Sequence, residues 1–159
     1  MKRRIAVGAA VAVVAGAGVA NAEPVAPAVG SSCADSVAGA FTQLPDGTTF
    51  LACEGVSGGY RWQPVSAPFE PSDRWLSYGP ALTLHGQGRR NPEILSGRWI
   101  ATPQDLASAC SAEQAPVTDA GVAPPQKTVG KPGQALDFEV LPVVFSIELG
   151  GDCLWKRVS

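Results

Sequence analysis

Strict alternation of apolar and acidic residues near the end of the chain constrains its fold most. Residues 136–140 read Leu-Asp-Phe-Glu-Val, and residues 145–149 read Phe-Ser-Ile-Glu-Leu. A Gly-Gly-Asp turn then leads into a third strand-like segment, residues 153–158. Because successive side chains of a strand point to opposite faces of a sheet, a period of two predicts antiparallel strands with one buried face. We therefore expect an all-β fold, a small antiparallel sandwich or barrel with at most one short helix in the mature chain.

Turn signals divide the preceding sequence into shorter segments. Asp46-Gly47 predicts a turn before a strand over residues 48–53, and Ser57-Gly58-Gly59 predicts another before residues 60–63. Further strand-like segments cover residues 80–85 and 98–102. In the first of these, Leu82 and Leu84 share one face, and Thr83 and His85 share the other. Residues 103–109 are the most helix-like part of the mature chain, with room for one turn, and the proline-rich residues 115–134 predict a long loop or a loose hairpin.

Four cysteines, Cys33, Cys53, Cys110 and Cys153, predict two disulfides. Four cysteines allow three pairings, and sequence alone does not decide among them. We favour Cys33–Cys53 and Cys110–Cys153, because each pair brackets a self-contained run of strand-like sequence. No two cysteines have the close spacing of a zinc site, and His85 is near none of them in sequence, so neither a metal nor another cofactor is expected.

The first 22 residues have the pattern of a cleavable signal peptide. Lys2, Arg3 and Arg4 precede an Ala/Gly-rich apolar run, and Ala20-Asn21-Ala22 follows it as a cleavage site. Residues 23–32 then predict a flexible leader. Residues 33–159 predict a single β-rich domain, composed of a stapled hairpin module (33–66) and a main sheet (67–159). The mature protein is expected to be secreted or associated with the cell envelope, without a membrane span.

The charge balance argues against nucleic acid as a partner. Without the signal peptide, nine of the 12 Lys and Arg residues and all 14 Asp and Glu residues remain, for a net charge of −5. Nucleic-acid binding requires a dense basic patch, and Arg89-Arg90 is an isolated pair. The expected partner is an envelope polymer or another exported protein; the sequence does not indicate an oligomeric state.

Two local patterns resemble small disulfide-stapled exported proteins of mycobacteria and other actinobacteria, most of which have no assigned function. The first pattern comprises Cys33, Gly39, Asp46-Gly47, Cys53 and Gly59-Tyr60-Arg61-Trp62. The second comprises Gly97-Arg98-Trp99, Cys110 and Gly151-Asp152-Cys153-Leu154-Trp155-Lys156-Arg157. The resemblance implies a β-module with disulfides near its ends, and it implies no activity.

The sequence predicts no catalytic site. His85 is the only imidazole, and no G-x-S-x-G motif accompanies it. A carboxylate pair could support glycoside hydrolysis, but solvated strand positions account for most of the acidic residues. The candidates considered are Glu70, Asp73, Glu93, Asp137, Glu139 and Glu148. A minimal hydrolase that uses His85 or such a pair is the third functional alternative.

Aromatic residues between positions 60 and 78 suggest surface recognition. The candidate binding residues are Tyr60, Trp62, Trp75, Tyr78 and Arg74. Aromatic faces stack on sugar rings and form hot spots in protein interfaces. Packing of Trp62 and Trp155 against the disulfides is the simpler interpretation of those two residues, whereas for Trp75 and Tyr78 the two interpretations are about equal. An exported, non-catalytic binding or envelope-associated protein is therefore the leading hypothesis, and a protease-inhibitor-like protein that presents residues 115–134 is the second.

Overall fold

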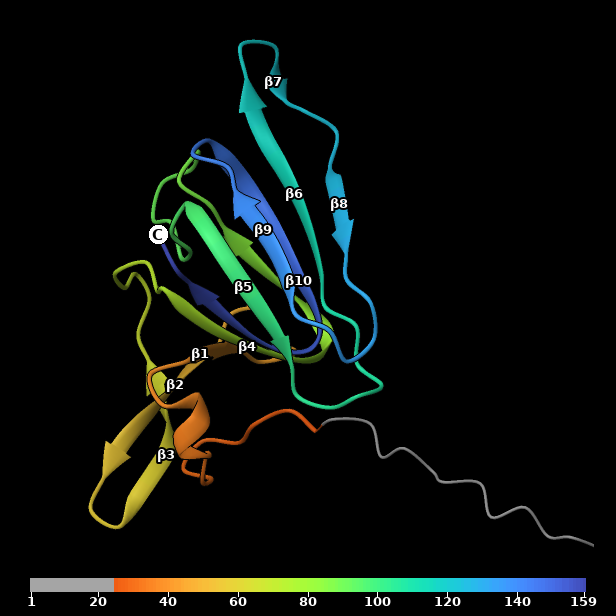
Figure 1. Ribbon diagram of the computed structural model, residues 1–159. Helices are drawn as coiled ribbons and strands as arrows, with labels where there is room; N and C mark the ends of the chain where they lie inside the picture. Colours follow the sequence, from red (N-terminus) through yellow and green to blue (C-terminus); the bar gives the residue numbers. More distant parts are fainter. Residues whose placement is uncertain (1–24) are drawn as a thin grey trace, which may run out of the picture.

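The computed structural model describes residues 25–159, and the predicted signal peptide, residues 1–22, lies outside the described residues. The described chain is nearly all β, which confirms the predicted fold class, and it is sandwich-like rather than a closed barrel (Figure 1). A 3₁₀ helix, η1 (Asp35–Val37), precedes the strands. The strands are β1 (Phe41–Gln43), β2 (Phe50–Val56), β3 (Gly59–Val65), β4 (Arg74–His85), β5 (Gly97–Pro103), β6 (Ser111–Thr118), β7 (Gly121–Val122), β8 (Gln126–Val129), β9 (Leu136–Val140) and β10 (Val144–Arg157).

The long antiparallel pair β4–β10 organises the sheet. β4 runs beside nearly the whole of β10, from Lys156 opposite Arg74 to Ser146 opposite His85. On its other side, β10 changes partner: its first half pairs with β6 and its second half with β5. β9 continues the sheet from β5, and β8 continues it from β6 (Figure 1). The sheet therefore divides into two branches around a shared core.

The main core lies on the inner face of this divided sheet. Leu136, Phe138 and Val140 of β9 are buried, while Asp137 and Glu139 are exposed, as the alternation predicts. Ile147 and Leu149 of β10 are likewise buried and Glu148 is exposed. A register shift between Val144 and Ser146 interrupts this alternation in β10, so Val144 is buried and Phe145 is only half-buried.

A second, smaller core belongs to residues 33–66, which we call the N-terminal module. Its buried side chains are Val37, Ala40, Leu51, Cys53 and Trp62. They pack against Leu76 and Leu154 on the outer face of the β4–β10 pair. Backbone pairing also begins before Cys33, because Gly30 donates to the Trp62 carbonyl at 2.8 Å and Trp62 donates to the Ser31 carbonyl at 2.9 Å. These bonds hold residues 30–32 of the predicted flexible leader against β3.

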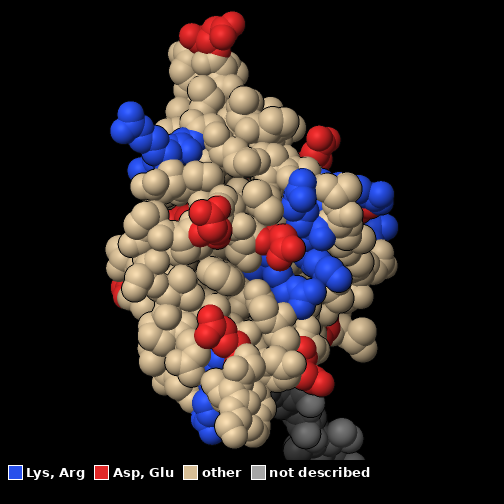
Figure 2. Space-filling view, turned by 90° about the vertical axis from the view of Figure 1, so that its left-hand side faces the viewer, with Lys and Arg blue, Asp and Glu red and all other residues tan. Residues whose placement is uncertain are grey.

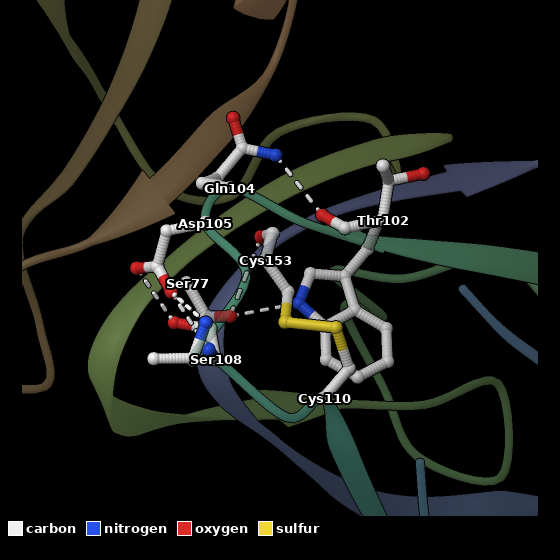
Figure 3. Close-up of a disulfide and its surroundings, with 9 residues drawn as sticks. Ser77, Thr102, Gln104, Asp105, Ser108, Cys110 and Cys153 are labelled. Carbon is white, nitrogen blue, oxygen red and sulfur yellow. Dashed lines mark hydrogen bonds between the residues drawn. A yellow bond between two sulfur atoms is a disulfide. The ribbon is translucent and has the colours of Figure 1, made fainter. Parts of the chain in front are cut away.

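Both favoured disulfide pairings are confirmed. Cys33–Cys53 joins the segment before η1 to β2, and Cys110–Cys153 joins the start of β6 to β10. Figure 3 shows Cys110–Cys153 between the central strands, with Ser77 of β4 beside it. Both of these cysteines are buried, and the Trp155 indole donates to the Ser77 hydroxyl at 2.8 Å. The Cys110–Cys153 disulfide is therefore part of the main core.

Residues 103–109, the most helix-like part of the mature chain, form no helical turn. Pro103 ends β5, and the Asp105 carboxylate accepts the N–H groups of Ala107 and Ser108, both at 2.7 Å (Figure 3). This side-chain bonding replaces a helical turn with a bend, after which the chain enters β6. Of the two alternatives predicted for residues 115–134, a long loop or a loose hairpin, the structure has the hairpin. Its β6–β7 end projects beyond the rest of the sheet (Figure 1). Among the described residues, no helix is long and apolar enough to cross a membrane.

Candidate functional site

The predicted binding aromatics do not form one exposed face. Trp62 and Tyr78 are each 4% exposed and Trp75 is fully buried, so only Tyr60, at 37%, is exposed. β4 lies in the middle of the sheet, and both Trp75 and Tyr78 belong to the main core. Arg74 is half-buried and donates to the Ala38 carbonyl at 2.6 Å, which ties β4 to the N-terminal module. The predicted recognition surface is thus replaced by packing.

Trp75 instead supports another aromatic residue that reaches the surface. The Phe69 ring lies 5.2 Å from the Phe41 ring, 5.1 Å from the Phe50 ring and 6.3 Å from the Trp75 ring, centroid to centroid. Phe69 is half-buried and belongs to the connector between β3 and β4. Three neighbouring rings therefore hold Phe69 in place from within the molecule.

Phe69 lines a cleft of about 300 Å³, which we call the Phe69 cleft. Its lining residues are Ala67, Pro68, Phe69, His85, Asn91 and Glu93. A more open hollow adjoins it through Pro68, Phe69 and Asn91 and continues to Glu70, Pro71 and Pro92. The connector after β3 thus forms one wall, and the end of β4 with the following turn forms the other. The isolated bridge between Ser72 and Ile94 holds these two walls together.

Glu93 organises the polar side of the Phe69 cleft. Its Oε2 accepts the backbone N–H of His85 at 2.8 Å, and its own N–H donates to the His85 carbonyl at 2.8 Å. Its Oε1 lies 3.7 Å from His85 Nδ1, which is beyond the usual length of a hydrogen bond. The side chains of His85 and Glu93 are 33% and 13% exposed. A largely buried carboxylate and a more accessible imidazole therefore lie side by side.

Asn91 occupies the turn between these two residues. Its φ of +52° is in the left-handed region, which asparagine tolerates better than most residues. Its amide is exposed and can donate as well as accept hydrogen bonds. Together with the Phe69 ring, the imidazole, amide and carboxylate groups suit a ligand that has both an apolar face and polar substituents.

The remaining predicted carboxylates lie apart from the Phe69 cleft, except Glu70. Asp137 pairs with Arg98, whose hydrogen bond lowers the pKa of that carboxyl. Glu139 and Glu148 point outward from their strands. Burial, followed by the charge of Asp105, raises the pKa of Asp152. This residue precedes Cys153 in β10 and does not line the Phe69 cleft. Among the described residues that line the Phe69 cleft, none has a hydroxyl or thiol side chain.

Sequence reasoning missed Phe69 and Asn91. Phe69 lies between prolines in a stretch with no periodicity. An aromatic residue in such a connector was the only sign in the sequence of a binding residue there. Asn91 precedes a proline in a turn, which gave no chemical signal. No cluster of three or more metal-ligating side chains occurs in the described part of the chain.

In the comparisons with known proteins, no family model matches the chain, and neither a curated protein nor a solved structure matches it. The geometry of the Phe69 cleft therefore carries the functional argument.

Proposed function

We propose that this protein is an exported, non-catalytic binding protein that associates with cell-envelope polymer through the Phe69 cleft. The observation that carries this proposal is an aromatic ring fixed among three others and bordered by imidazole, amide and carboxylate groups. The predicted signal peptide supports export, as does the presence of two disulfides, which persist in oxidising compartments. The resemblance of its two cysteine patterns to small exported actinobacterial proteins also supports export.

A fixed aromatic ring is well suited to binding a sugar unit. Ordering a side chain on binding costs roughly 0.5–1.5 kcal/mol, and a ring that is already packed avoids most of that cost. The Phe69 ring offers an apolar surface, and the adjacent polar groups offer hydrogen-bond partners for hydroxyl groups. A cleft of about 300 Å³ is at the small end of ligand sites, which suits a single unit of a polymer.

Cosedimentation with isolated mycobacterial envelopes tests the proposal. We expect oxidised protein of residues 23–159 to pellet with the envelopes, and a His85→Gln/Asn91→Gly variant to remain in solution. Glycine keeps the left-handed backbone at position 91 while it removes the amide. Leu106→Ser, at an 88% exposed leucine outside the cleft lining, is the control and should pellet like the parent. Absence of pelleting by the parent, or unchanged pelleting of the double variant, would overturn the proposal.

The projecting hairpin favours a second candidate, a protease-inhibitor-like protein. Every residue of β7 and β8 is exposed, and the β6–β7 end extends away from the core (Figure 1). An inhibitor of this kind would lower the activity of a secreted serine protease stoichiometrically, and replacement of residues 119–125 by a short glycine linker would abolish the effect. No loss of protease activity at a molar excess of the protein would exclude this candidate for the protease used.

A further inference from the structure

We infer that the Phe69 cleft binds a polysaccharide unit that carries a positively charged free amine, an inference that rests on the proposed function and narrows its ligand. The charges around the cleft are the first support. Glu93 lines the cleft, and Glu70 lines the adjoining hollow on the other side of Phe69. Among the described residues that line either space, none is lysine or arginine. The cleft therefore favours a cation over an anion.

Glu93 has an oxygen available for such a cation. One carboxylate oxygen is engaged by the His85 backbone, while the other lies 3.7 Å from the imidazole and retains capacity for a donor. Because the side chain is only 13% exposed, its charge is less screened than that of a fully solvated carboxylate. A hydrogen bond from an ammonium group to this oxygen would be charge-assisted, and such bonds are stronger than neutral ones.

The Phe69 ring adds a second attraction for the same group. The face of an aromatic ring is electron-rich and attracts cations that lie within about 6 Å of its centre. The nearest basic residues in sequence, Arg89 and Arg90, do not fill this position. The Arg89 guanidinium lies over the Phe145 ring, 5.0 Å from its centroid, and Arg90 is exposed and outside the cleft lining.

A hollow at the β5–β9 edge also has carboxylates beside an aromatic ring, but Arg98 lines it and pairs with Asp137. Figure 2 shows acidic and basic side chains interspersed on one face of the molecule. The strand register shows the same mixture, because Asp137 and Lys156 flank Ile100, and Lys156 in turn lies opposite Arg74. Such mixed charges largely cancel at a distance. The Phe69 cleft differs because carboxylates and an aromatic ring line it and its adjoining hollow without a lysine or arginine.

A sugar fits these groups better than a basic peptide does. The Asn91 amide and the His85 imidazole provide hydrogen-bond partners for hydroxyl groups beside an apolar ring. The adjoining open hollow leaves room for the polymer to continue past Glu70. The expected ligand is therefore an amino sugar whose nitrogen is not acetylated.

Calorimetric titration with two matched oligosaccharides tests the inference. The probes are a glucosamine tetramer and the same tetramer fully N-acetylated, at about pH 7, where amines remain largely protonated and imidazoles are largely neutral. We expect the free-amine tetramer to bind, with the acetylated one about tenfold weaker or undetectable. Added salt should weaken the binding, because the attraction is between charges.

Two charge-neutralising variants locate the binding. Glu93→Gln and Glu70→Gln should each weaken binding of the free-amine tetramer, while Glu54→Gln, at an exposed position of β2, should leave it unchanged. Glu70 is exposed and makes no hydrogen bond with another described side chain, so its variant remains informative even where Glu93→Gln disturbs the turn.

The remaining outcomes separate this inference from the proposed function. Equal binding of both tetramers, stronger binding of tetralysine, or no binding of either tetramer by a protein that pellets with envelopes would overturn the inference alone. Failure to bind both the tetramers and the envelopes would overturn the inference and the proposed function together.

Discussion

At the scale of single residues, the side chains of two glutamines form the hydrogen bonds that the backbone of a neighbouring strand would otherwise form. The Gln43 amide donates to the Thr83 carbonyl at 3.0 Å and accepts the Thr83 N–H at 2.9 Å. The Gln114 amide donates to the Glu139 carbonyl at 2.8 Å and accepts the Leu141 N–H at 3.1 Å. Each side chain thus repeats the pattern by which one strand pairs with the next, and Gln114 joins the two branches of the sheet through β6 and β9.

Replacement of Gln114 by alanine should destabilise the protein by about 1–3 kcal/mol, because it leaves two backbone groups of the β9 edge without partners. The side chain is 9% exposed, so water can replace it only in part. Chemical denaturation would measure the loss. Gln104→Ala is the matched control, since its exposed amide bonds only the Thr102 carbonyl, and its effect should stay within about 0.5 kcal/mol. Equal effects of the two substitutions would contradict the bridging role of Gln114.

The turn before β2 contains an acid-sensitive group, Asp46. Hydrogen bonds from the Thr49 hydroxyl, and then from the N–H groups of Thr48 and Thr49, lower its pKa to about 2. A carboxyl group with a lowered pKa stabilises the folded state at any pH above its pKa in the unfolded chain. This stabilisation is lost as the pH falls through its lower pKa in the folded state. Asp46→Asn should therefore lower the thermal midpoint at pH 7, and the difference from the parent should disappear as the pH falls to about 2. A difference that is constant over this range would show that the charge is not involved.

At the scale of secondary-structure elements, the two disulfides constrain the chain to different extents. They close segments of 20 and 43 residues, for which the chain-entropy relation gives about 3 and about 4 kcal/mol. Double replacement of Cys110 and Cys153 by alanine should therefore cost more than the same replacement of Cys33 and Cys53. Denaturation of the two variants under oxidising conditions would compare them. A larger loss at Cys33–Cys53 would mean that the N-terminal module contributes more to global stability than the main core does.

The predictability of each strand from sequence depends on its neighbours. β9 could be predicted because one face is buried and the other faces water, so Leu136, Phe138 and Val140 alternate with acidic residues. β4 has strands on both sides, and the register shift beside Gly79 places inward-facing residues out of phase. Trp75 and Tyr78 are three residues apart, a spacing that does not fit a period of two, so they lacked a periodic signal although both are core residues. Residues 103–109 had room for one helical turn but form a bend, because the Asp105 carboxylate accepts hydrogen bonds from its backbone.

The candidate site was only partly predictable, because two distant segments form it. His85, Glu93 and Glu70 were recognised by residue type, but nothing in the sequence places Phe69 beside Asn91. The bridge between Ser72 and Ile94 joins these segments, and such a contact depends on the whole sheet. The disulfide pairing favoured from sequence is correct, because each bridge encloses a continuous run of strands, although the sequence alone left all three pairings open.

At the scale of the whole molecule, the two cores should differ in stability. The central pair β4–β10 is flanked by strands on both sides, whereas β3 and β8 are mostly exposed strands at the edges. Exposed strands with few buried contacts open locally at low cost. Native-state hydrogen exchange should find the slowest amides in β4 and the second half of β10 and faster ones in β3 and β8. Equal protection of all four strands would indicate that the N-terminal module and the hairpin open only with the main core.

The change of partners along β10 also governs the order in which the chain can assemble. Both branches of the sheet depend on residues 144–157, which follow every other strand in the chain. A chain that passes through a narrow pore with its amino end first can join Cys33 to Cys53 early. Its two sheet branches cannot be connected until β10, the last strand, has also passed through. Cys110 must likewise wait for Cys153. Under the export that we propose, such a polypeptide would cross the membrane unfolded and form its sheet only after the last strand has crossed.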